Sequence, residues 1–168
     1  MNDEEAAVAS RASREWMDNH CEVYLRSGGT KGHIMDLTSL GGHRFTTNCL
    51  IRHKGRKSGR TLINPLVYGD IGGEVVIVAS KGGKPPNPGW YYNITASETV
   101  DFQIATQAFR ARWREAEGDE RKRLWAFMVD ILPNYELYQK IAERRIPVIV
   151  MTPQEEIPVF SLADRSPS

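Results

Sequence analysis

The sequence predicts an α+β domain in which about six mostly antiparallel strands curl into a small barrel, with an N-terminal helix and flanking helices. Three observations support this fold class. The 168 residues are enough for one domain with a proper core. Tight turns rich in glycine join neighbouring strand patterns, which implies antiparallel pairing. The alternating βαβ units and the G-x-G-x-x-G turn of a Rossmann fold are absent.

The composition argues against several classes of protein. The formal net charge of +1 gives no global attraction to nucleic acid or to acidic membranes. The acidic N-terminus has no apolar core and is not a signal peptide, and no apolar run approaches the ~20 residues of a membrane span. Cys21 and Cys49 have no C-x-x-C spacing, which fits a reduced chain. We therefore expect a cytoplasmic protein that binds no nucleic acid.

The first element, within residues 1–29, is a helix from Glu4 to Ser27 that ends at Gly28-Gly29. Its apolar side chains recur near the helical period, at Val8, Ala12, Trp16, Val23 and Tyr24. Such a helix packs on its own domain or on a partner. Contact with a membrane surface stays open, although the acidic first turn argues against it, and the oligomeric state stays open as well.

Residues 30–153 are expected to form the barrel. After a polar connection that ends at His43, alternating or continuous apolar residues between turn signals indicate strands. Pro65 places the second of these strands at an edge of the sheet or forces a bulge there. The predicted strands are Arg44 to His53, Thr61 to Tyr68, Glu74 to Ser80, Thr99 to Ala105, Ala108 to Glu117 and Ile146 to Met151.

Three shorter helices are expected in the same region. One runs from Trp90 to Ala96, a second from Asp119, as its N-terminal cap, to Leu132, and a third from Tyr135 to Arg144. Pro133 separates the last two, because its ring cannot continue a helix. Residues 154–168 are expected to be a loose C-terminal tail.

The stretch from Ser80 to Asn93, S-K-G-G-K-P-P-N-P-G-W-Y-Y-N, follows a buried strand and combines Lys81 and Lys84 with glycine backbone. Cations and free backbone N–H groups just past a strand end are how proteins hold phosphate. After Gly89, three aromatic residues can offer a surface to a planar, phosphorylated cofactor. A surface loop that merely needs glycine and proline explains the same spacing.

The turn from Lys54 to Arg60 forms, with Arg52 and His53, the densest cationic patch in the chain. It is a second candidate for an anion site. A solvated hairpin tip is the simplest alternative, and a nucleic-acid patch is the third, although aromatic residues are not interleaved here. A metal site is not expected, because His20, His33, His43 and His53 have no ligand spacing. Motifs of serine hydrolases and P-loop proteins are absent.

Five motifs in register resemble the deazaflavin-dependent nitroreductase family. They are G-R-K-S-G at Gly55 to Gly59, N-P-L at Asn64 to Leu66, A-S-K-G-G at Ala79 to Gly83, N-P-G-W-Y-Y-N at Asn87 to Asn93 and R-R-I-P-V at Arg144 to Val148. The members are split β-barrel oxidoreductases that use coenzyme F420, and the resemblance covers Thr46 to Pro153. It implies a reductase that transfers hydride from reduced F420 to an electron-poor enone, quinone or nitro compound.

The resemblance also implies the roles of particular residues. The cationic turn would hold the phosphate and glutamate tail of the cofactor, while the ends of two strands and the following loop would flank its ring. The cofactor-binding residues it implies are Arg56, Lys57, Ser58, Asn64, Pro65, Leu66, Val67, Val78, Ala79, Ser80, Lys81, Gly89, Trp90, Tyr91, Tyr92 and Asn93.

The N-Y-E-L-Y segment matches a motif whose tyrosines face the substrate, which assigns catalytic roles to Tyr135 and Tyr138 together with Ser80. Tyr135 or Ser80 would donate a hydrogen bond to the oxygen that gains charge. Helix packing is the alternative reading of both tyrosines. Val67 and Leu132 stand where a nitroimidazole-reducing relative has tyrosines, so a more aliphatic pocket is expected.

Two rival functions stay open. The fold also hosts enzymes that bind FMN, so FMN is the alternative cofactor, and a non-catalytic F420-binding carrier is the alternative to an enzyme. F420 is preferred because Arg52, Arg56, Lys57 and Arg60 are more cations than a lone phosphate needs. Leu62 stands where relatives can carry an arginine, which reduces the preference expected for F420 over FMN.

Overall fold

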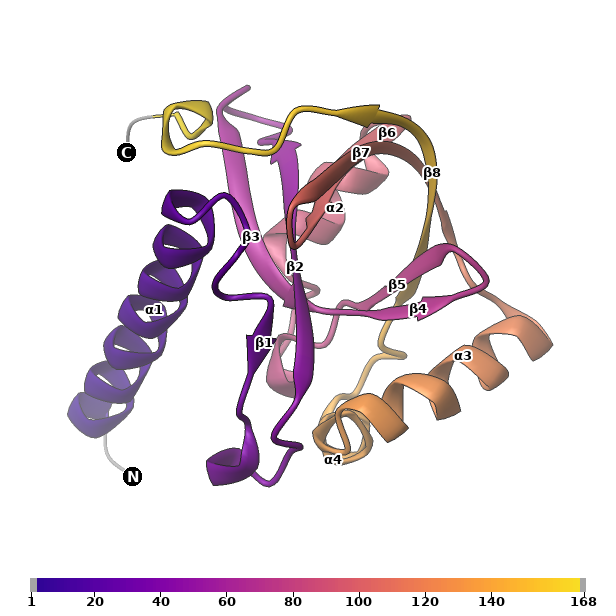
Figure 1. Ribbon diagram of the computed structural model, residues 1–168. Coiled ribbons are helices and arrows are strands. Elements are labelled where there is room, and N and C mark those ends of the chain that lie inside the picture. Colours follow the sequence, from indigo (N-terminus) through magenta and orange to yellow (C-terminus); the bar gives the residue numbers. More distant parts are fainter. Residues whose placement is uncertain (1–2, 167–168) are drawn as a thin grey trace.

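The computed structural model describes residues 3–166 of the chain, and their side chains from residue 15 onward. It confirms the predicted α+β class: one curled antiparallel sheet with helices at its margins (Figure 1). The helices are α1 (Asp3–Arg26), α2 (Gly89–Thr95), α3 (Gly118–Ile131) and α4 (Asn134–Ile141). The strands are β1 (Ile34–Met35), β2 (Thr46–Lys54), β3 (Thr61–Val67), β4 (Gly69–Ile71), β5 (Glu74–Val78), β6 (Thr99–Ile104), β7 (Gln107–Glu115) and β8 (Val148–Ile157).

Every predicted strand is present, and two short strands, β1 and β4, were not expected because two or three residues show no readable pattern. The order in the sheet is β1-β2-β6-β7-β8-β5-β4, and β3 pairs with β2 off this path. All pairs are antiparallel. Pro65 lies in regular register with Leu50, so the edge position predicted for its strand is correct and no bulge is needed.

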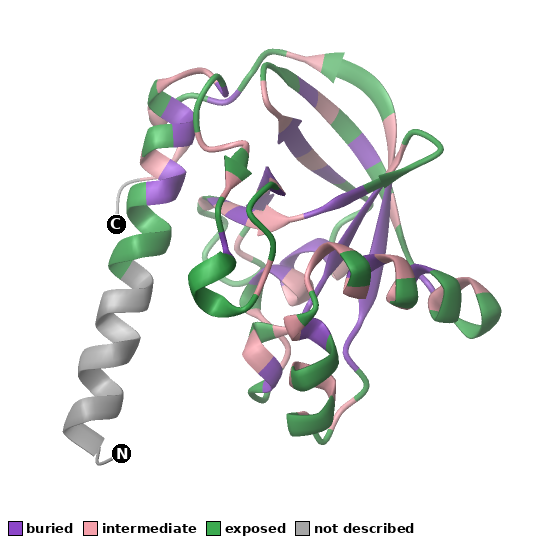
Figure 2. Cartoon of the chain, turned by 60° about the horizontal axis from the view of Figure 1, so that its bottom comes forward, coloured by how far each residue is buried: buried purple, intermediate pink, exposed green. Residues whose placement is uncertain are grey.

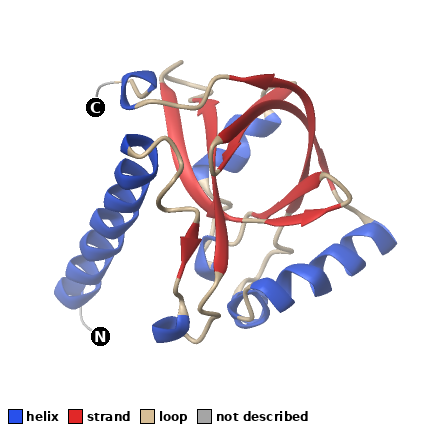
Figure 3. Cartoon of the chain, in the orientation of Figure 1, coloured by secondary structure: helices blue, strands red, loops and turns tan. Residues whose placement is uncertain are grey.

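The barrel closes through a bend in the chain rather than through a last ladder. At Tyr68 the chain passes from β3, at one end of the sheet, to β4, at the other. Gly69 makes the bend against α3, and a Cβ there would lie 2.6 Å from side-chain atoms of Phe127 and Ile131. In the described ladders β3 pairs only with β2, so a seam stays open between β3 and the end of β5 (Figure 3).

Three apolar clusters hold the fold together. The first fills the barrel and includes Ile51, Ile77, Phe102 and Trp90. The second lies under α3 and α4, and the third joins α1 to the outer face of β2 and β3. Figure 2 shows that the last turns of α1, within the part of the helix whose side chains are described, hold buried residues, among them Cys21, Tyr24 and Leu25.

Helix α1 packs on its own domain through a face that the sequence located only in part. Tyr24 is buried as expected, and its hydroxyl donates to the carbonyl of Asn48 at 3.0 Å. Trp16 and Val23, predicted on the same apolar face, are exposed instead. The side chains of Val8 and Ala12 lie outside the described residues. Of the helices described, none is long and apolar enough to cross a membrane.

The C-terminal segment corrects the expectation of a loose tail. Strand β8 runs on to Ile157, and the side chain of Phe160 is only 1% exposed within the cluster beneath α1. The Arg52 guanidinium lies 4.4 Å from the Phe160 ring and forms ion pairs with Asp101 at 2.7 Å and Asp164 at 3.1 Å. This segment is therefore part of the core.

Helix α3 also begins differently from the prediction. Asp119 lies in its first turn and does not cap it; Glu117 occupies the cap position and makes no side-chain capping bond. The chain turns into the helix at Gly118, whose φ of +57° favours glycine. An acidic residue in the first turn still interacts favourably with the helix dipole.

Replacing Phe160 with alanine should destabilise the protein by about 3–5 kcal/mol, because a fully buried aromatic side chain is lost and a cavity remains. Chemical denaturation followed by circular dichroism measures the change. Val159→Ala, at an exposed neighbouring position, should cost less than about 1 kcal/mol. Equal stabilities for both variants would show that the C-terminal segment contributes no more to stability than a loose tail does.

Candidate functional site

The seam between β3 and β5 contains a cavity of about 210 Å³. Its walls come from β3, the end of β5, α1, the connection before β2, and the segment that joins α3 to α4. Several residues that the resemblance implied meet here: Pro65, Leu66, Val67, Val78, Ser80 and Tyr135. Val67 and Leu132, which were expected to make the pocket aliphatic, both line it.

Other lining residues were not foreseen. They are Trp16, Met17, His20, Met35, Leu37, Leu40 and Asn48. Their only signal in the sequence was the apolar character of the helix and of a few residues in a polar connection, which does not reveal that these segments fold over the seam. Trp16 is 49% exposed, so it borders the mouth of the cavity.

Tyr135 is the buried tyrosine of this site. It is 4% exposed and packs against Trp125 and Tyr138, with ring centroids 6.2 and 6.3 Å away. Burial raises the pKa of its hydroxyl well above the ordinary value, so the group stays protonated and can act as a donor. Tyr138 meets the Tyr135 ring edge-on and is not among the described residues that line the cavity.

The loop after β5 is held in place by Arg144. The guanidinium donates to the carbonyls of Ala79 at 3.2 Å, Ser80 at 2.8 Å and Lys84 at 3.1 Å. Between these points Lys81 has a φ of +48°, an uncommon conformation for a residue with a side chain. Lys81 and Lys84 are exposed, whereas Ala79 is fully buried: its N–H donates to the carbonyl of Pro147 and its carbonyl accepts from Arg144.

Glycine is required where this loop meets α4. Gly83 has a φ of +83°, and a Cβ there would lie 2.6 Å from the carbonyl oxygen of Tyr138. Helix α4 ends at Ile141 and not at the predicted Arg144, because the chain must turn back after the helix for the Arg144 side chain to reach the loop.

The predicted aromatic surface of α2 divides into different environments. Trp90 is 8% exposed and belongs to the barrel cluster, so most of its ring packs inside the barrel and little of it is open to a cofactor. The position of Trp90 on the helix directs its side chain inward, because the helix must fill one end of the barrel. Tyr91 donates a hydrogen bond to Glu115, and the Tyr92 ring lies 5.1 Å from the Arg56 guanidinium. Gly89 begins the helix, and Asn93 is buried.

The cationic turn between β2 and β3 is closed by backbone hydrogen bonds. The N–H of Gly55 donates to the carbonyl of Arg60 at 2.9 Å, and the N–H of Gly59 donates to the carbonyl of Gly55 at 2.8 Å. The hydroxyl of Ser58 accepts from the N–H of Arg60. Lys57 is exposed and forms no hydrogen bond or ion pair with any residue that the structure describes. Its ammonium group is available to a ligand.

Arg52 does not contribute to this patch as expected. Its guanidinium is half-buried and committed to Asp101 and Asp164, so its charge is already neutralised. Arg56 remains in the turn, where both its backbone N–H and its guanidinium donate to the Oδ1 of Asn93 at 3.0 Å. The turn is thus attached to α2.

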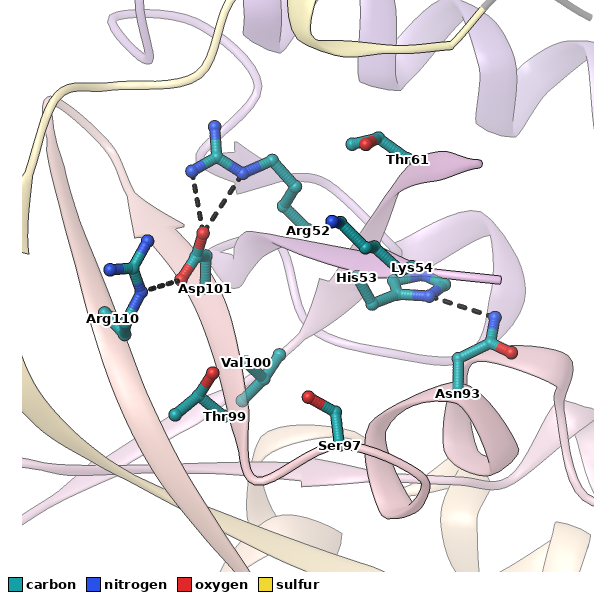
Figure 4. Close-up of a pocket in the computed structure, with 10 residues that line it drawn as sticks. All are labelled: Arg52, His53, Lys54, Thr61, Asn93, Ser97, Thr99, Val100, Asp101 and Arg110. Atoms are coloured by element: carbon teal, nitrogen blue, oxygen red, sulfur yellow. Dashed lines mark hydrogen bonds and ion pairs between the residues drawn. The ribbon is translucent and has the colours of Figure 1, made fainter. Parts of the chain in front are cut away.

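A second, larger cavity of about 450 Å³ opens where β2 and β6 diverge beyond the Arg52–Asp101 pair (Figure 4). Its two arginines are already paired, because Arg52 and Arg110 share the carboxylate of Asp101. It lacks the apolar walls of a cofactor site, so we place the reaction in the seam cavity despite its smaller volume. Within the described residues, no cluster of histidine, cysteine and acidic side chains could hold a metal ion.

Comparison with known proteins decides the family. The model of the family described as F420H2-dependent quinone reductase matches residues 16–153. The chain belongs to this family. A F420H2-dependent quinone reductase of Mycobacterium tuberculosis is 32% identical over 149 residues, which cover 82% of this chain and 95% of that protein.

Two solved structures agree. One, described as an F420H2-dependent reductase (FDR-A), is 37% identical, with a TM-score of 0.58 over 62% of this chain and 92% of the other. A second, described as a domain-swapped dimer, is 33% identical, with a TM-score of 0.61 over 83% and 98%. The split-barrel fold and the assignment as an oxidoreductase with F420H2 as donor are therefore confirmed. The family is named for quinones, however, and not for nitro compounds.

Replacing Arg144 with lysine should loosen the loop after β5, because one ammonium group cannot reach three carbonyls in the same geometry. Loss of charge-assisted bonds worth about 1.4 kcal/mol would speed amide hydrogen exchange at Gly83 and Lys84 about tenfold. Arg145→Lys, at the exposed neighbouring position, is the matched control and should leave exchange unchanged. Equal exchange in both variants would show that α4 alone holds the loop.

Proposed function

We propose that this protein binds F420 along β3 and passes hydride from its reduced form to a quinone. The observation that supports this proposal is that the short strand β3 connects two environments, each of which suits one end of the cofactor. Its first residue, Thr61, follows the turn that presents Lys57, and its last residues line the aliphatic seam cavity with Ser80 and Tyr135. A cofactor with a planar ring and a long anionic tail matches that combination.

The residues present fit such a group. The walls formed by Pro65, Leu66, Val67 and Val78 suit a flat ring, and few polar groups compete with it. At about 210 Å³ the cavity is smaller than the ~300–1,000 Å³ typical of whole ligand sites, so it accommodates the reacting ring and not the tail. The tail would then lie toward the cationic turn, where backbone donors and Lys57 meet its phosphate and carboxylates.

The protein's own part in the reaction is orientation and polarisation. When bound, reduced F420 supplies the hydride. The aliphatic walls exclude water and hold the acceptor against the ring. Tyr135, which stays protonated, donates a hydrogen bond to the acceptor oxygen as that oxygen gains negative charge. Ser80, at the same cavity, is the second candidate donor.

The acceptor class follows from the cavity walls that the segments before β2 and between α3 and α4 add. Met35, Leu37, Leu40 and Leu132 make the rest of the cavity apolar, which suits a quinone or an enone better than a charged substrate. Two alternatives would contradict this proposal for the present chain: binding of FMN as tight as that of F420, and binding of F420 without turnover. Cytoplasmic location and membrane contact of α1 stay predictions.

One experiment separates these alternatives. Purified protein is titrated with F420 and with FMN at moderate salt, and bound reduced F420 is then mixed with menadione or cyclohexenone in a single turnover. Tighter binding of F420 and rapid oxidation by menadione support the proposal. Equal affinity for FMN argues against the cofactor, and absence of oxidation argues for a carrier.

Lys57→Ala should weaken F420 binding at least about fivefold, since an exposed ammonium group that meets phosphate or carboxylate is lost. Higher salt should weaken the wild type more than this variant. Fluorescence titration gives both dissociation constants. Lys122→Ala removes the same charge from the exposed surface of α3 and serves as the control. An unchanged constant for Lys57→Ala would remove the anion site from the turn.

Tyr135→Phe deletes only a hydroxyl group and should lower turnover with a quinone by about tenfold to a hundredfold, while the dissociation constant for F420 stays near that of the wild type. Steady-state kinetics and titration measure the two effects separately. Tyr138→Phe, which alters the neighbouring ring outside the cavity, should retain activity. If Tyr135→Phe turns over normally, the tyrosine is a packing residue and Ser80→Ala becomes the variant to test.

A further inference from the structure

A buried histidine links two asparagines that belong to different motifs. His53, at the end of β2, is 8% exposed and lies between Asn64 of β3 and Asn93 of α2. Its Nε2 is 2.6 Å from the Oδ1 of Asn64. Its Nδ1 is 3.1 Å from the Nδ2 of Asn93, a contact that Figure 4 shows. His53 itself stands outside the motifs on which the family resemblance rests.

The hydrogen-bond pattern fixes the protonation state of this ring. The Oδ1 of Asn93 already accepts two bonds from Arg56, so its Nδ2 is the atom that faces His53, and an amide nitrogen only donates. Nδ1 of His53 must therefore accept. The single ring proton then lies on Nε2 and is donated to Asn64. Each of these polar groups can therefore act only as the donor or only as the acceptor that its neighbours require.

We propose that His53 is a positioning residue for the anion-binding turn. By accepting from the Asn93 amide, the neutral ring fixes which way that amide points. Asn93 in turn holds the backbone N–H and the guanidinium of Arg56, and so sets the conformation from which Arg56 and Lys57 meet an anion. This inference rests on the proposed function, because the anion is taken to be the phosphate and carboxylate tail of F420.

The same geometry makes the turn sensitive to acid. A proton on Nδ1 would place an N–H opposite the Asn93 amide N–H, and two donors cannot bond. Rotating the amide would satisfy His53 but would turn its nitrogen toward the two donors of Arg56. In the first case the amide loses the bond that orients it, and in the second the turn loses its two bonds to Asn93.

The buried position of His53 keeps its ring neutral near pH 7. Burial lowers the pKa of His53 below its ordinary value, and the bond to Asn64 opposes this in part. The charged groups that face it include Arg52 and Lys54 on its own strand and Arg56 on the turn. Asp101 of β6 and Arg110 of β7 line the same cavity as His53 and are paired with each other. Asp164, from the C-terminal segment, is paired with Arg52, and Tyr92 of α2 lies against Arg56.

The direction of the pH effect follows. A histidine whose pKa is lowered in the working state favours the neutral form, so cofactor affinity is complete above the ordinary pKa of about 6.5 and falls as the pH drops below it. The glutamate carboxylates of the tail lose their charge only near pH ~4.3. Between these values, His53 is the group in the support of the turn that changes its charge.

The test combines binding and spectroscopy. F420 is titrated at about pH 7.5 and about pH 5.5 into the wild type, His53→Ala and His53→Asn. Asparagine can supply an acceptor near the position of Nδ1 but cannot be protonated. We expect His53→Ala to bind about five- to tenfold more weakly at the higher pH, and His53→Asn to bind nearly as tightly as the wild type. The wild type should lose affinity at the lower pH, whereas His53→Asn should not.

A readout without cofactor completes the design. Nitrogen-15 NMR of the imidazole should show the Nε2–H tautomer at about pH 7.5 in the free protein. An Nδ1–H tautomer, or an acid-induced loss of affinity that persists in His53→Asn, would overturn the proposal. So would wild-type affinity in His53→Ala while Lys57→Ala is impaired. Wild-type affinity in Lys57→Ala instead identifies a failure of the proposed function. His43→Asn, at an exposed histidine, is the control.

Discussion

The site depends on a seam that backbone pairing leaves open. β3 is paired along one edge with β2, and Pro65 offers no N–H to its other edge. The chain instead bends through Tyr68 and Gly69, and β4 covers only the first part of β5. Side chains, rather than a ladder, therefore fill the gap, and they leave the cavity that Val78, Ser80 and Tyr135 share. A fully closed barrel of this size would have had no such space.

The length of β3 explains how one cofactor could use both ends of the seam. Seven residues at ~3.3 Å each make the strand roughly 20 Å long, with the cationic turn before its first residue and the cavity along its last three. A ring in the cavity and charges in the turn must therefore belong to an extended molecule. FMN ends at one phosphate, whereas F420 continues into several carboxylates, so the added charges are what the exposed Lys57 can distinguish. Shape alone cannot separate two tricyclic rings of nearly equal size.

Local sequence patterns predicted much of the fold and part of the site. Alternating residues and glycine turns located the long strands, and Pro65 indicated an edge, because those rules act over a few residues. They failed where the decisive partner is distant: Arg52 is neutralised by Asp164, 112 positions along the chain, and Phe160 is buried beneath α1 although its segment reads as polar. The aromatic character of Trp90 was visible, but its direction was not, since a short helix can face the barrel or the ligand.

Two multidentate side chains prepare the site before any ligand arrives. Arg144 holds three carbonyls at the ring end, and Asn93, oriented by His53, holds two donors of Arg56 at the tail end. Both loops are rich in glycine and would otherwise lose roughly 1–2 kcal/mol of backbone entropy per residue on binding. Because that ordering is complete in the folded protein, a ligand gains more net affinity from each contact. The family motifs thus determine the conformation of these loops as much as their contacts with a ligand. This explains why a histidine outside the motifs can affect binding.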